Sequence, residues 1–233
     1  MSRLARAVKE CGALLQVALD VTDALEAFRI ASAIPDNPLL VLEAGTPLIK
    51  SAGMSSVKML RSAKPEVPIV ADTKTFDAAD VEAKIVHEAG GDAFTVLALA
   101  SEETLEMAVA KASELGLMVY ADTMNVPRYY MERTLKKLSD LGVHVALLHV
   151  GVDVQRRAGF RATELMSYIR VASDTFKGPI AVAGGIKPSE VAKFAWAGAK
   201  IVIVGSAIVR AENPRNEAIK ALESLREAGF KCR

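Results

Sequence analysis

The sequence contains few of the residues by which metalloproteins and disulfide-rich proteins are usually recognised. It has two cysteines and three histidines in 233 residues, so neither a disulfide framework nor a Cys/His zinc cluster is expected. The cysteines, Cys11 and Cys232, lie near opposite ends of the chain and away from any His/Asp constellation. No Walker or dinucleotide glycine pattern is present, which argues against a nucleotide cofactor.

Long apolar runs and an excess of one charge are also missing. No run approaches the ~20 residues of a membrane span, and the start of the chain lacks the pattern of a signal peptide. Lys plus Arg number 29 against 28 for Asp plus Glu. This balance argues against nucleic acid or an anionic membrane as the main partner, although a local basic patch stays open. We expect a cytoplasmic protein that binds neither.

What the sequence does have is a series of short runs rich in Val, Ile, Leu and Ala. None alternates polar with apolar residues over its length, and such near-continuous apolar runs are typical of a parallel sheet buried on both faces. The eight runs are residues 15–20, 39–43, 68–72, 92–97, 117–122, 144–149, 179–183 and 200–204.

Helical periodicity fills the stretches between these runs. Leu105, Ala108 and Ala112 fall at helical offsets, and Asp23 and Ser101 stand where helix caps are expected. Eight strand–helix units with short connections predict a closed α/β barrel, the TIM (β/α)8 fold. We expect one domain over residues 1–233, with residues 1–13 as an N-terminal lead-in segment.

Polar residues gather where the predicted strands end. Strands one, two, three, five and six end in Asp20, Glu43, Asp72, Asp122 and His149. The carboxyl ends of barrel strands carry the chemistry in this fold, and buried charges need partners or a metal. These residues therefore predict a functional site, with the alternative that some of them only cap helices. Strand four supplies no ionisable residue at its end.

Two of these acids suit a metal ion. Glu43 and Asp72 are on adjacent strands at the same level, and Mg²⁺ typically takes one or two carboxylates while keeping open positions for water and substrate. The alternative makes Glu43 an ion-pair partner of Lys50 or Lys74.

The three histidines differ in position. His149 closes strand six at the predicted catalytic face, and histidine's ordinary pKa near neutrality suits a general base. His144 opens the same strand, and His87 lies in a helical stretch, so both are assigned structural roles.

Glycines follow the last two strands. Gly184 and Gly185 come after strand seven, and Gly205 with Ser206 after strand eight. Each pair alone also fits a tight turn, but barrels of this type bind phosphate at this place, on exposed backbone N–H groups. The sequence therefore predicts a phosphate site.

Four motifs carry a resemblance to a known family. The segment 72–77, Asp-Thr-Lys-Thr-Phe-Asp, resembles the Asp-x-Lys-x-x-Asp motif of the orotidine 5′-phosphate decarboxylase superfamily of dimeric barrels. The segments 43–50, 149–155 and 181–186 resemble those of 3-hexulose-6-phosphate synthases. The likeness runs in order from about Gln16 to Ile208.

The resemblance implies an aldehyde-lyase that joins formaldehyde to D-ribulose 5-phosphate in a reversible, Mg²⁺-dependent aldol reaction through an enediolate. It implies Glu43 and Asp72 as metal ligands, Lys74 as support for the enediolate, and His149 as the base. Asp77 would reach into the neighbouring subunit's site of a homodimer. Asp20 and Asp122 would then orient substrate hydroxyls, with Asp122 also a candidate for proton handling near formaldehyde.

One alternative lies in the same superfamily, 3-keto-L-gulonate-6-phosphate decarboxylase. Those relatives place Glu, Arg, Thr and Arg where this chain has Asp122, Val152, Ala183 and Ser206, which favours the synthase. Orotidine decarboxylases carry an extra Lys where this chain has Glu43. A barrel that binds a sugar phosphate without turnover is the alternative of another class.

One position departs from the synthase pattern, because Ala78 stands where a Gly is usual, so the conformation of its loop stays open. The physiological direction, the preferred metal and a fusion to another domain are also left open by the sequence.

Overall fold

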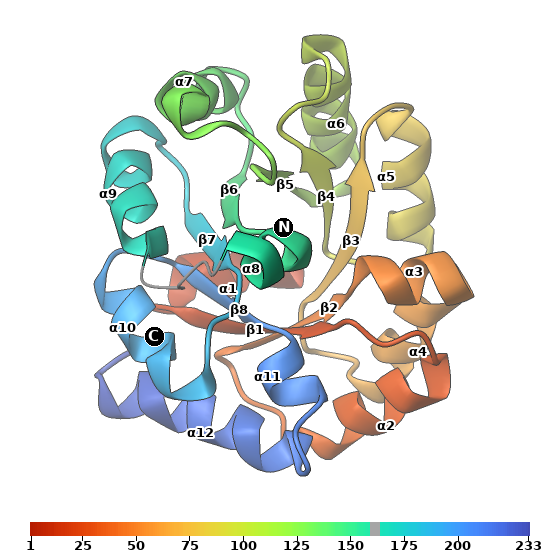
Figure 1. Cartoon of the computed structure of the whole chain (residues 1–233). Helices are drawn as coiled ribbons and strands as arrows, with labels where there is room; N and C mark the ends of the chain where they lie inside the picture. The colour runs from red at the N-terminus through yellow and green to blue at the C-terminus, as the bar shows by residue number, and fades with distance from the viewer. Residues whose placement is uncertain (159–163) are drawn as a thin grey trace.

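A closed barrel of parallel strands forms the centre of the protein. The computed structural model describes residues 1–158 and 164–233, and the strands pair in the order β1 to β8, with β8 closing on β1 (Figure 1). The predicted TIM (β/α)8 fold is therefore confirmed. The strands are β1 (Leu14–Leu19), β2 (Leu40–Ala44), β3 (Ile69–Thr75), β4 (Ala93–Leu97), β5 (Met118–Asp122), β6 (Val145–His149), β7 (Ile180–Ala183) and β8 (Ile201–Val204).

Helices surround the barrel and return the chain between successive strands. The predicted caps are present, since Asp23 accepts a hydrogen bond from Leu25 N and Ser101 accepts one from Thr104 N. The helices are α1 (Arg3–Glu10), α2 (Ala24–Ala33), α3 (Thr46–Ala52), α4 (Ser55–Ala63), α5 (Ala79–Glu88), α6 (Glu102–Leu115), α7 (Met131–Asp140), α8 (Val152–Ala158), α9 (Leu165–Thr175), α10 (Val191–Trp196), α11 (Ser206–Val209) and α12 (Pro214–Glu227), with 3-10 turns η1 (Arg128–Tyr130) and η3 (Pro188–Glu190).

The strands are buried on both faces, as their apolar runs predict. Every residue of β1, β2, β5, β7 and β8 is buried, because side chains of alternate residues fill the barrel or pack under the helices. Several polar side chains of the strands are buried as well. They include Gln16, Glu43, Asp72, Thr75, Thr95, Tyr120 and Asp122.

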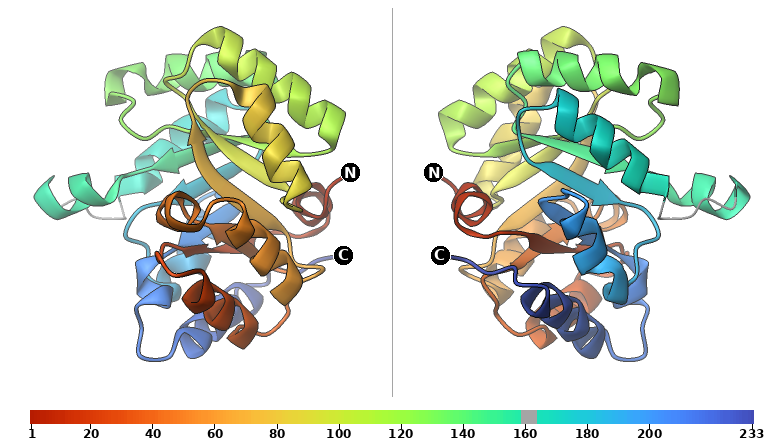
Figure 2. Two further views of the ribbon diagram at one scale, coloured as in Figure 1. Left: turned by 90° about the vertical axis from the view of Figure 1, so that its right-hand side faces the viewer. Right: turned by 90° about the vertical axis from the view of Figure 1, so that its left-hand side faces the viewer.

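The two ends of the chain meet on the side of the molecule away from α8 (Figure 2). There Cys11 and Cys232 form a disulfide and an isolated antiparallel bridge. Nothing in the sequence indicated this pairing, because the two cysteines are 221 positions apart. The lead-in helix α1 is also anchored, since the backbone N–H of Arg3 donates to Asp92.

In the parts of the chain that are described, none of the helices is both long enough and apolar enough to cross a membrane.

Candidate active site

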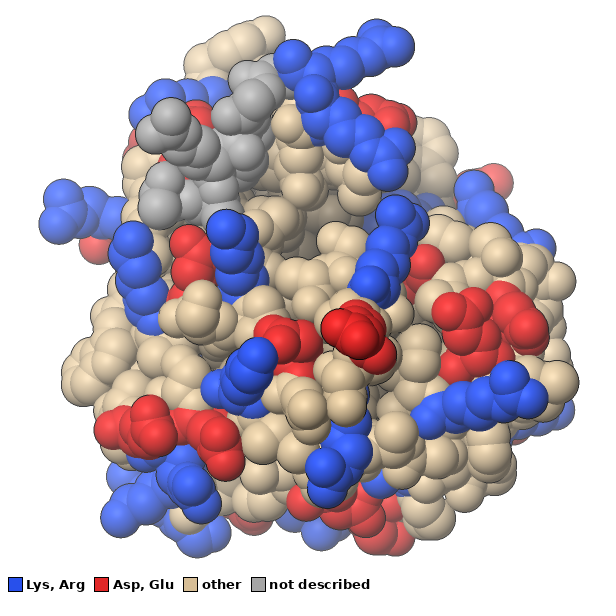
Figure 3. All heavy atoms as spheres, turned by 60° about the horizontal axis from the view of Figure 1, so that its bottom comes forward, with Lys and Arg blue, Asp and Glu red and all other residues tan. Residues whose placement is uncertain are grey.

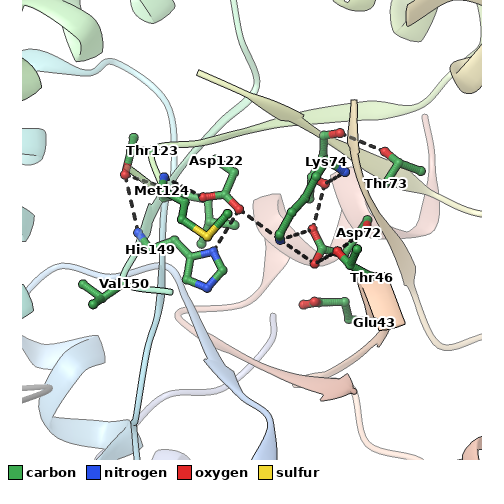
Figure 4. A network of polar contacts seen from close by, with 12 residues as sticks. Glu43, Thr46, Asp72, Thr73, Lys74, Asp122, Thr123, Met124, His149 and Val150 are labelled. Carbon is green, nitrogen blue, oxygen red and sulfur yellow. Dashed lines mark hydrogen bonds and ion pairs between the residues drawn. The ribbon is translucent and has the colours of Figure 1, made fainter. Parts of the chain in front are cut away.

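Side chains from four strands converge at the carboxyl end of the barrel (Figure 4). Glu43 comes from β2, Asp72 and Lys74 from β3, Asp122 from β5 and His149 from β6. These are the residues that the sequence analysis placed at strand ends. The structure brings them into one cluster.

Lys74 is the cation at the centre of this cluster. Its Nζ lies 2.7 Å from Asp72 Oδ2, 2.9 Å from Asp72 Oδ1 and 3.2 Å from Asp122 Oδ2. Burial alone would lower the pKa of Lys74, but the two carboxylates raise it above its ordinary value. The ammonium group therefore stays protonated and links β3 to β5.

Asp122 also orients the histidine. Its Oδ2 lies 2.8 Å from His149 Nδ1, and its Oδ1 accepts a hydrogen bond from Met124 N at 2.9 Å. Burial would raise the pKa of Asp122, but His149 and then Lys74 lower it below the usual value. An ionised carboxylate can only accept, so Nδ1 carries a proton and Nε2 is the ring nitrogen left to face a substrate. The carboxylate thus contacts His149, Lys74 and the backbone N–H of Met124. Its predicted role toward substrate hydroxyls or a proton near formaldehyde stays a prediction.

Glu43 has no cation of its own among the described residues. Its Oε2 accepts a hydrogen bond from Gln16 Nε2 at 2.5 Å, and Tyr120 Oη donates to Gln16 Oε1 at 3.2 Å. Burial, followed by the charges of Asp72 and Asp20, raises the pKa of Glu43 well above its ordinary value. The alternative in which Glu43 pairs with a lysine is thus not what the structure shows.

The acids of the cluster fit a hard cation. Within residues 1–158 and 164–233, no group of three or more His, Cys, Asp or Glu side chains is arranged to hold a metal ion. Glu43 and Asp72 nonetheless present two carboxylates whose mutual repulsion a cation would relieve, and Mg²⁺ binds through one or two carboxylates plus water and substrate oxygens. The residues present therefore suit such an ion.

Asp72 is fully engaged by other side chains. Its Oδ1 accepts from Thr95 Oγ1 at 2.8 Å and its Oδ2 from Thr46 Oγ1 at 2.7 Å, in addition to Lys74. Thr46 Oγ1 has a second acceptor, the Asp72 carbonyl oxygen, at 2.8 Å. Lys74 Nζ also has one, Asp122 Oδ2, at 3.2 Å. A cation approaching Asp72 can therefore displace one of them without leaving it unpaired.

Asp20 lies half-buried beside two glycine loops. A Cβ atom on Gly45 would come within 2.2 Å of Asp20 Oδ1, and one on Gly205 within 3.2 Å of Oδ2. Burial and then Asp72 raise the pKa of Asp20. A side chain at position 45 would therefore force the Asp20 carboxylate to move from this position.

The predicted phosphate residues lie on neighbouring loops, because β7 and β8 are paired. Gly184 and Gly185 have φ values of 132° and 66°, which side-chain-bearing residues rarely adopt. Gly205 precedes α11, whose first residue is the exposed Ser206. The four residues thus keep the arrangement predicted from the sequence, and phosphate binding itself stays a prediction.

Asp77 does not join the cluster within this chain. It is exposed, and its Oδ1 accepts a hydrogen bond from Ala78 N at 2.8 Å. Ala78 has φ 51° and ψ 42°, the left-handed conformation that favours glycine. The loop keeps this shape even though the usual glycine is absent.

The two remaining histidines lie outside the cluster. His87 is exposed on α5, and His144 Nδ1 accepts a hydrogen bond from Val119 N at 3.1 Å. Burial lowers the pKa of His144, which suits a neutral, structural side chain.

Three site residues were not found from the sequence. Thr46 lies in the recognised segment 43–50, but no role was given to it. Thr95 and Gln16 interrupt apolar runs with a polar side chain, and that interruption was the available signal. None of the three is ionisable, so none belongs to the set of charged strand-end residues that the sequence predicted.

Comparison with known proteins shows the family to which the chain belongs. Residues 13–221 match the family described as "Orotidine 5′-phosphate decarboxylase / HUMPS family". The "Bifunctional enzyme Fae/Hps" of Methanoculleus marisnigri is 34% identical over 212 residues, which cover 91% of this chain and 52% of that protein. The chain thus spans about half the length of the curated relatives it matches.

Solved structures of related proteins superpose on most of this chain. 3-Hexulose-6-phosphate synthase from Salmonella typhimurium superposes with a TM-score of 0.84 at 31% identity, over 92% of this chain and 99% of that one. 3-Keto-L-gulonate-6-phosphate decarboxylase from Vibrio cholerae superposes with a TM-score of 0.73 at 27% identity, over 92% and 98%.

Proposed function

Because the chain belongs to the orotidine 5′-phosphate decarboxylase / HUMPS family, we propose that it catalyses the reversible, Mg²⁺-dependent aldol addition of formaldehyde to D-ribulose 5-phosphate, giving D-arabino-3-hexulose 6-phosphate. The observation that carries this proposal is the chain of contacts Asp72–Lys74–Asp122–His149 beside Glu43. It places the Lys74 ammonium group and the His149 imidazole on the same oxygen of Asp122. The relatives named as synthases support the substrates.

His149 is the base in this proposal. Its Nδ1 proton is held by Asp122 at 2.8 Å, so Nε2 is the nitrogen that accepts a proton from C1 of the sugar. Proton transfer of this kind contributes roughly 10²–10⁴-fold to a rate. The electron pair of the broken C1–H bond forms the enediolate.

Lys74 stabilises the negative charge that develops on the enediolate. Its raised pKa keeps it charged at neutral pH, and its position between Asp72 and Asp122 fixes where that charge stands. A divalent cation held by Glu43 and Asp72 would supply further electrophilic stabilisation of the substrate oxygens.

The carbon–carbon bond then forms between C1 and formaldehyde. The enediolate donates its electron pair to the formaldehyde carbon, and the proton held by His149 passes to the new alkoxide. Asp20 would orient a substrate hydroxyl, and the phosphate would be held by the loops carrying Gly184, Gly185, Gly205 and Ser206. Binding energy from the phosphate end would orient the reacting end.

The central experiment measures formaldehyde consumption with D-ribulose 5-phosphate, with and without EDTA. We expect consumption that EDTA abolishes and Mg²⁺ restores. His149→Ala should keep phosphate-ligand binding but lose proton exchange at C1 in deuterated water. Full exchange by this variant would overturn the role of His149.

A decarboxylase is the second candidate, because a keto-gulonate phosphate decarboxylase is among the structural neighbours. The arginines expected for that activity are replaced here by Val152 and Ser206. Release of CO₂ from 3-keto-L-gulonate 6-phosphate, without formaldehyde consumption, would favour the decarboxylase. Ligand binding with neither reaction would favour a non-catalytic barrel.

We also propose a homodimer with shared sites. Apolar side chains are exposed at Phe76, next to Asp77, and at Val81 and Ile85 on the following helix α5, at 58%, 55% and 40%, and exposed apolar patches often mark interfaces. Asp77→Ala and His149→Ala variants, each inactive alone, should regain about a quarter of the wild-type activity when refolded together, because half of the dimers would contain one intact site. No recovery would show that Asp77 acts within its own subunit.

A cytoplasmic location and the absence of a nucleic-acid partner remain proposals. Basic and acidic side chains are interspersed on the face drawn in Figure 3, and no binding to nucleic acid is expected from that pattern. The Cys11–Cys232 disulfide bears on the location, because disulfides are rare in reducing compartments outside hyperthermophiles. Thiol titration of protein isolated without reductant would show which state occurs.

A further inference from the structure

Strand β3 is irregular at the point where it delivers Lys74. Its pairing with β4 runs Val70 to Ala93 and Ala71 to Phe94, but the next pair is Thr75 with Val96. Four residues of β3 thus span the length of two residues of β4. Such bulges occur beside active sites, where they re-aim a side chain.

The bulge holds Lys74 in an unusual backbone conformation. Its φ is 49°, in the left-handed region that residues with a Cβ rarely adopt. A side chain on an ordinary strand at this position would follow the alternation of the pleat. The left-handed turn instead lets the Lys74 ammonium fold back onto Asp72, two residues earlier in the chain.

Thr95 on β4 holds this conformation through its hydroxyl. The backbone N–H of Lys74 donates to Thr95 Oγ1 at 2.8 Å, and Thr95 Oγ1 donates to Asp72 Oδ1 at 2.8 Å. The hydroxyl therefore accepts the hydrogen bond that a regular ladder would have given to a β4 carbonyl.

These bonds close a ring. Starting from the Lys74 backbone, the ring passes through the Thr95 hydroxyl to Asp72 Oδ1 and returns through Lys74 Nζ, which lies 2.9 Å from that oxygen. The side-chain ammonium of Lys74 is thereby linked to the Asp72 carboxylate directly, and its backbone N–H through the Thr95 hydroxyl. The directions are fixed, because the backbone N–H and the ammonium can only donate and the carboxylate can only accept.

Neighbouring bonds support the ring from the other side. Thr73 Oγ1 donates to the Thr95 carbonyl at 2.8 Å, and Thr95 itself is 1% exposed. No substrate is expected to touch a side chain buried to this extent.

We propose that Thr95 is a positioning residue of the reaction: its hydroxyl holds the β3 bulge and so sets where the Lys74 charge stands between Asp72 and Asp122. The proposal rests on the proposed function for its effect on rate. Its structural part, the conformation of Lys74, can be measured without any activity.

The test compares variants that differ by one oxygen atom. Thr95→Ser keeps the hydroxyl, and Thr95→Ala removes it. Thr95→Val removes the hydroxyl while keeping the bulk of the side chain. Thr134→Val on α7 makes the same Thr-to-Val change away from the site and is the control. We expect kcat to fall on the order of 100-fold in the Ala and Val variants and to stay within about threefold in the Ser and control variants. KM for the sugar phosphate should change little, because the phosphate loops are untouched.

Crystal structures of the variants give the second readout. Lys74 should leave the left-handed region in the Ala and Val variants and keep φ near 49° in the Ser variant. An unchanged φ, an unchanged kcat, or a Ser variant as impaired as the Ala variant would each overturn the proposal. If the Val variant does not fold, the Ser and Ala pair decides.

Failure of the proposed function would look different. In that case the wild-type protein would not consume formaldehyde, and the φ of Lys74 in the variants alone would decide the role of Thr95.

Discussion

Asp122 is a single carboxylate on which two functional side chains depend. One oxygen serves both His149 Nδ1, at 2.8 Å, and Lys74 Nζ, at 3.2 Å, while the other accepts from Met124 N at 2.9 Å. An Asp122→Asn substitution keeps the shape of the side chain but replaces one acceptor oxygen with an NH₂ group, which only donates. The backbone N–H of Met124 fixes which end remains oxygen.

The NH₂ group of the asparagine would therefore face two donors. The imidazole of His149 can restore the bond only by moving its proton from Nδ1 to Nε2, and that tautomer is no longer a base at the substrate. The corresponding change in the serine protease triad lowers kcat about 10⁴-fold. For Asp122→Asn we expect a loss of about 10³- to 10⁴-fold in kcat, or roughly 4–5.5 kcal/mol in activation free energy.

Two measurements test this reasoning. The first is kcat with proton exchange at C1, and the second is ¹⁵N NMR of the His149 ring, which reports the protonated nitrogen without any substrate. Asp174→Asn on the exposed face of α9 is the control, and thermal melting checks that each variant is folded. The reasoning is refuted if Asp122→Asn keeps more than about a tenth of kcat or if Nδ1 keeps its proton.

Three further predictions concern stability. Replacing Cys232 by Ser should lower the free energy of unfolding in oxidising buffer by about 2–4 kcal/mol. Chain entropy sets a limit of about 5 kcal/mol for a separation of 221 residues. Equal melting temperatures of wild type and variant without reductant would contradict this prediction. Glu43→Gln should raise the metal-free melting temperature near neutral pH by about 2–4 °C per kcal/mol relieved, because the raised pKa of Glu43 makes its ionisation costly in the folded state. The difference in melting temperature between variant and wild type should be small below the ordinary carboxyl pKa and grow as the pH rises above that pKa. The variant should also lose stabilisation by Mg²⁺. A difference in melting temperature that does not depend on pH would contradict this prediction. Ala78→Gly should raise the free energy of unfolding by up to about 1 kcal/mol. The reason is that the left-handed backbone costs alanine about 1–2 kcal/mol, more than the entropy cost of glycine. An unchanged urea midpoint would count against this prediction.

The barrel could be predicted because its signal is local and repeated. Each apolar run is buried on both faces, so its composition alone marks it as a strand of a parallel sheet. Positions at the carboxyl ends of parallel strands share one face, so Glu43, Asp72, Asp122 and His149 could be grouped without knowing any distance.

The partners of these residues could not be predicted in the same way. Thr95 can bind the backbone of Lys74 because β3 carries extra residues opposite it. The composition of an apolar run does not predict such a bulge. Cys11 and Cys232 meet because closure of the barrel brings β1 beside β8 and both chain ends to one side. Such contacts depend on the register of distant segments, which composition and periodicity do not specify.

The position of Lys74 shows why one such contact changes the interpretation of a whole site. From the sequence, Lys74 was one of two lysines, with Lys50, that could pair with Glu43. In the structure the β3 bulge turns it toward Asp72 and Asp122, so Glu43 keeps only the neutral Gln16 as its partner among the described residues. A buried carboxylate without a counter-charge is costly unless it takes up a proton or a cation binds it, so the irregular backbone of β3 leaves Glu43 without an ion-pair partner and available to the proposed metal ion.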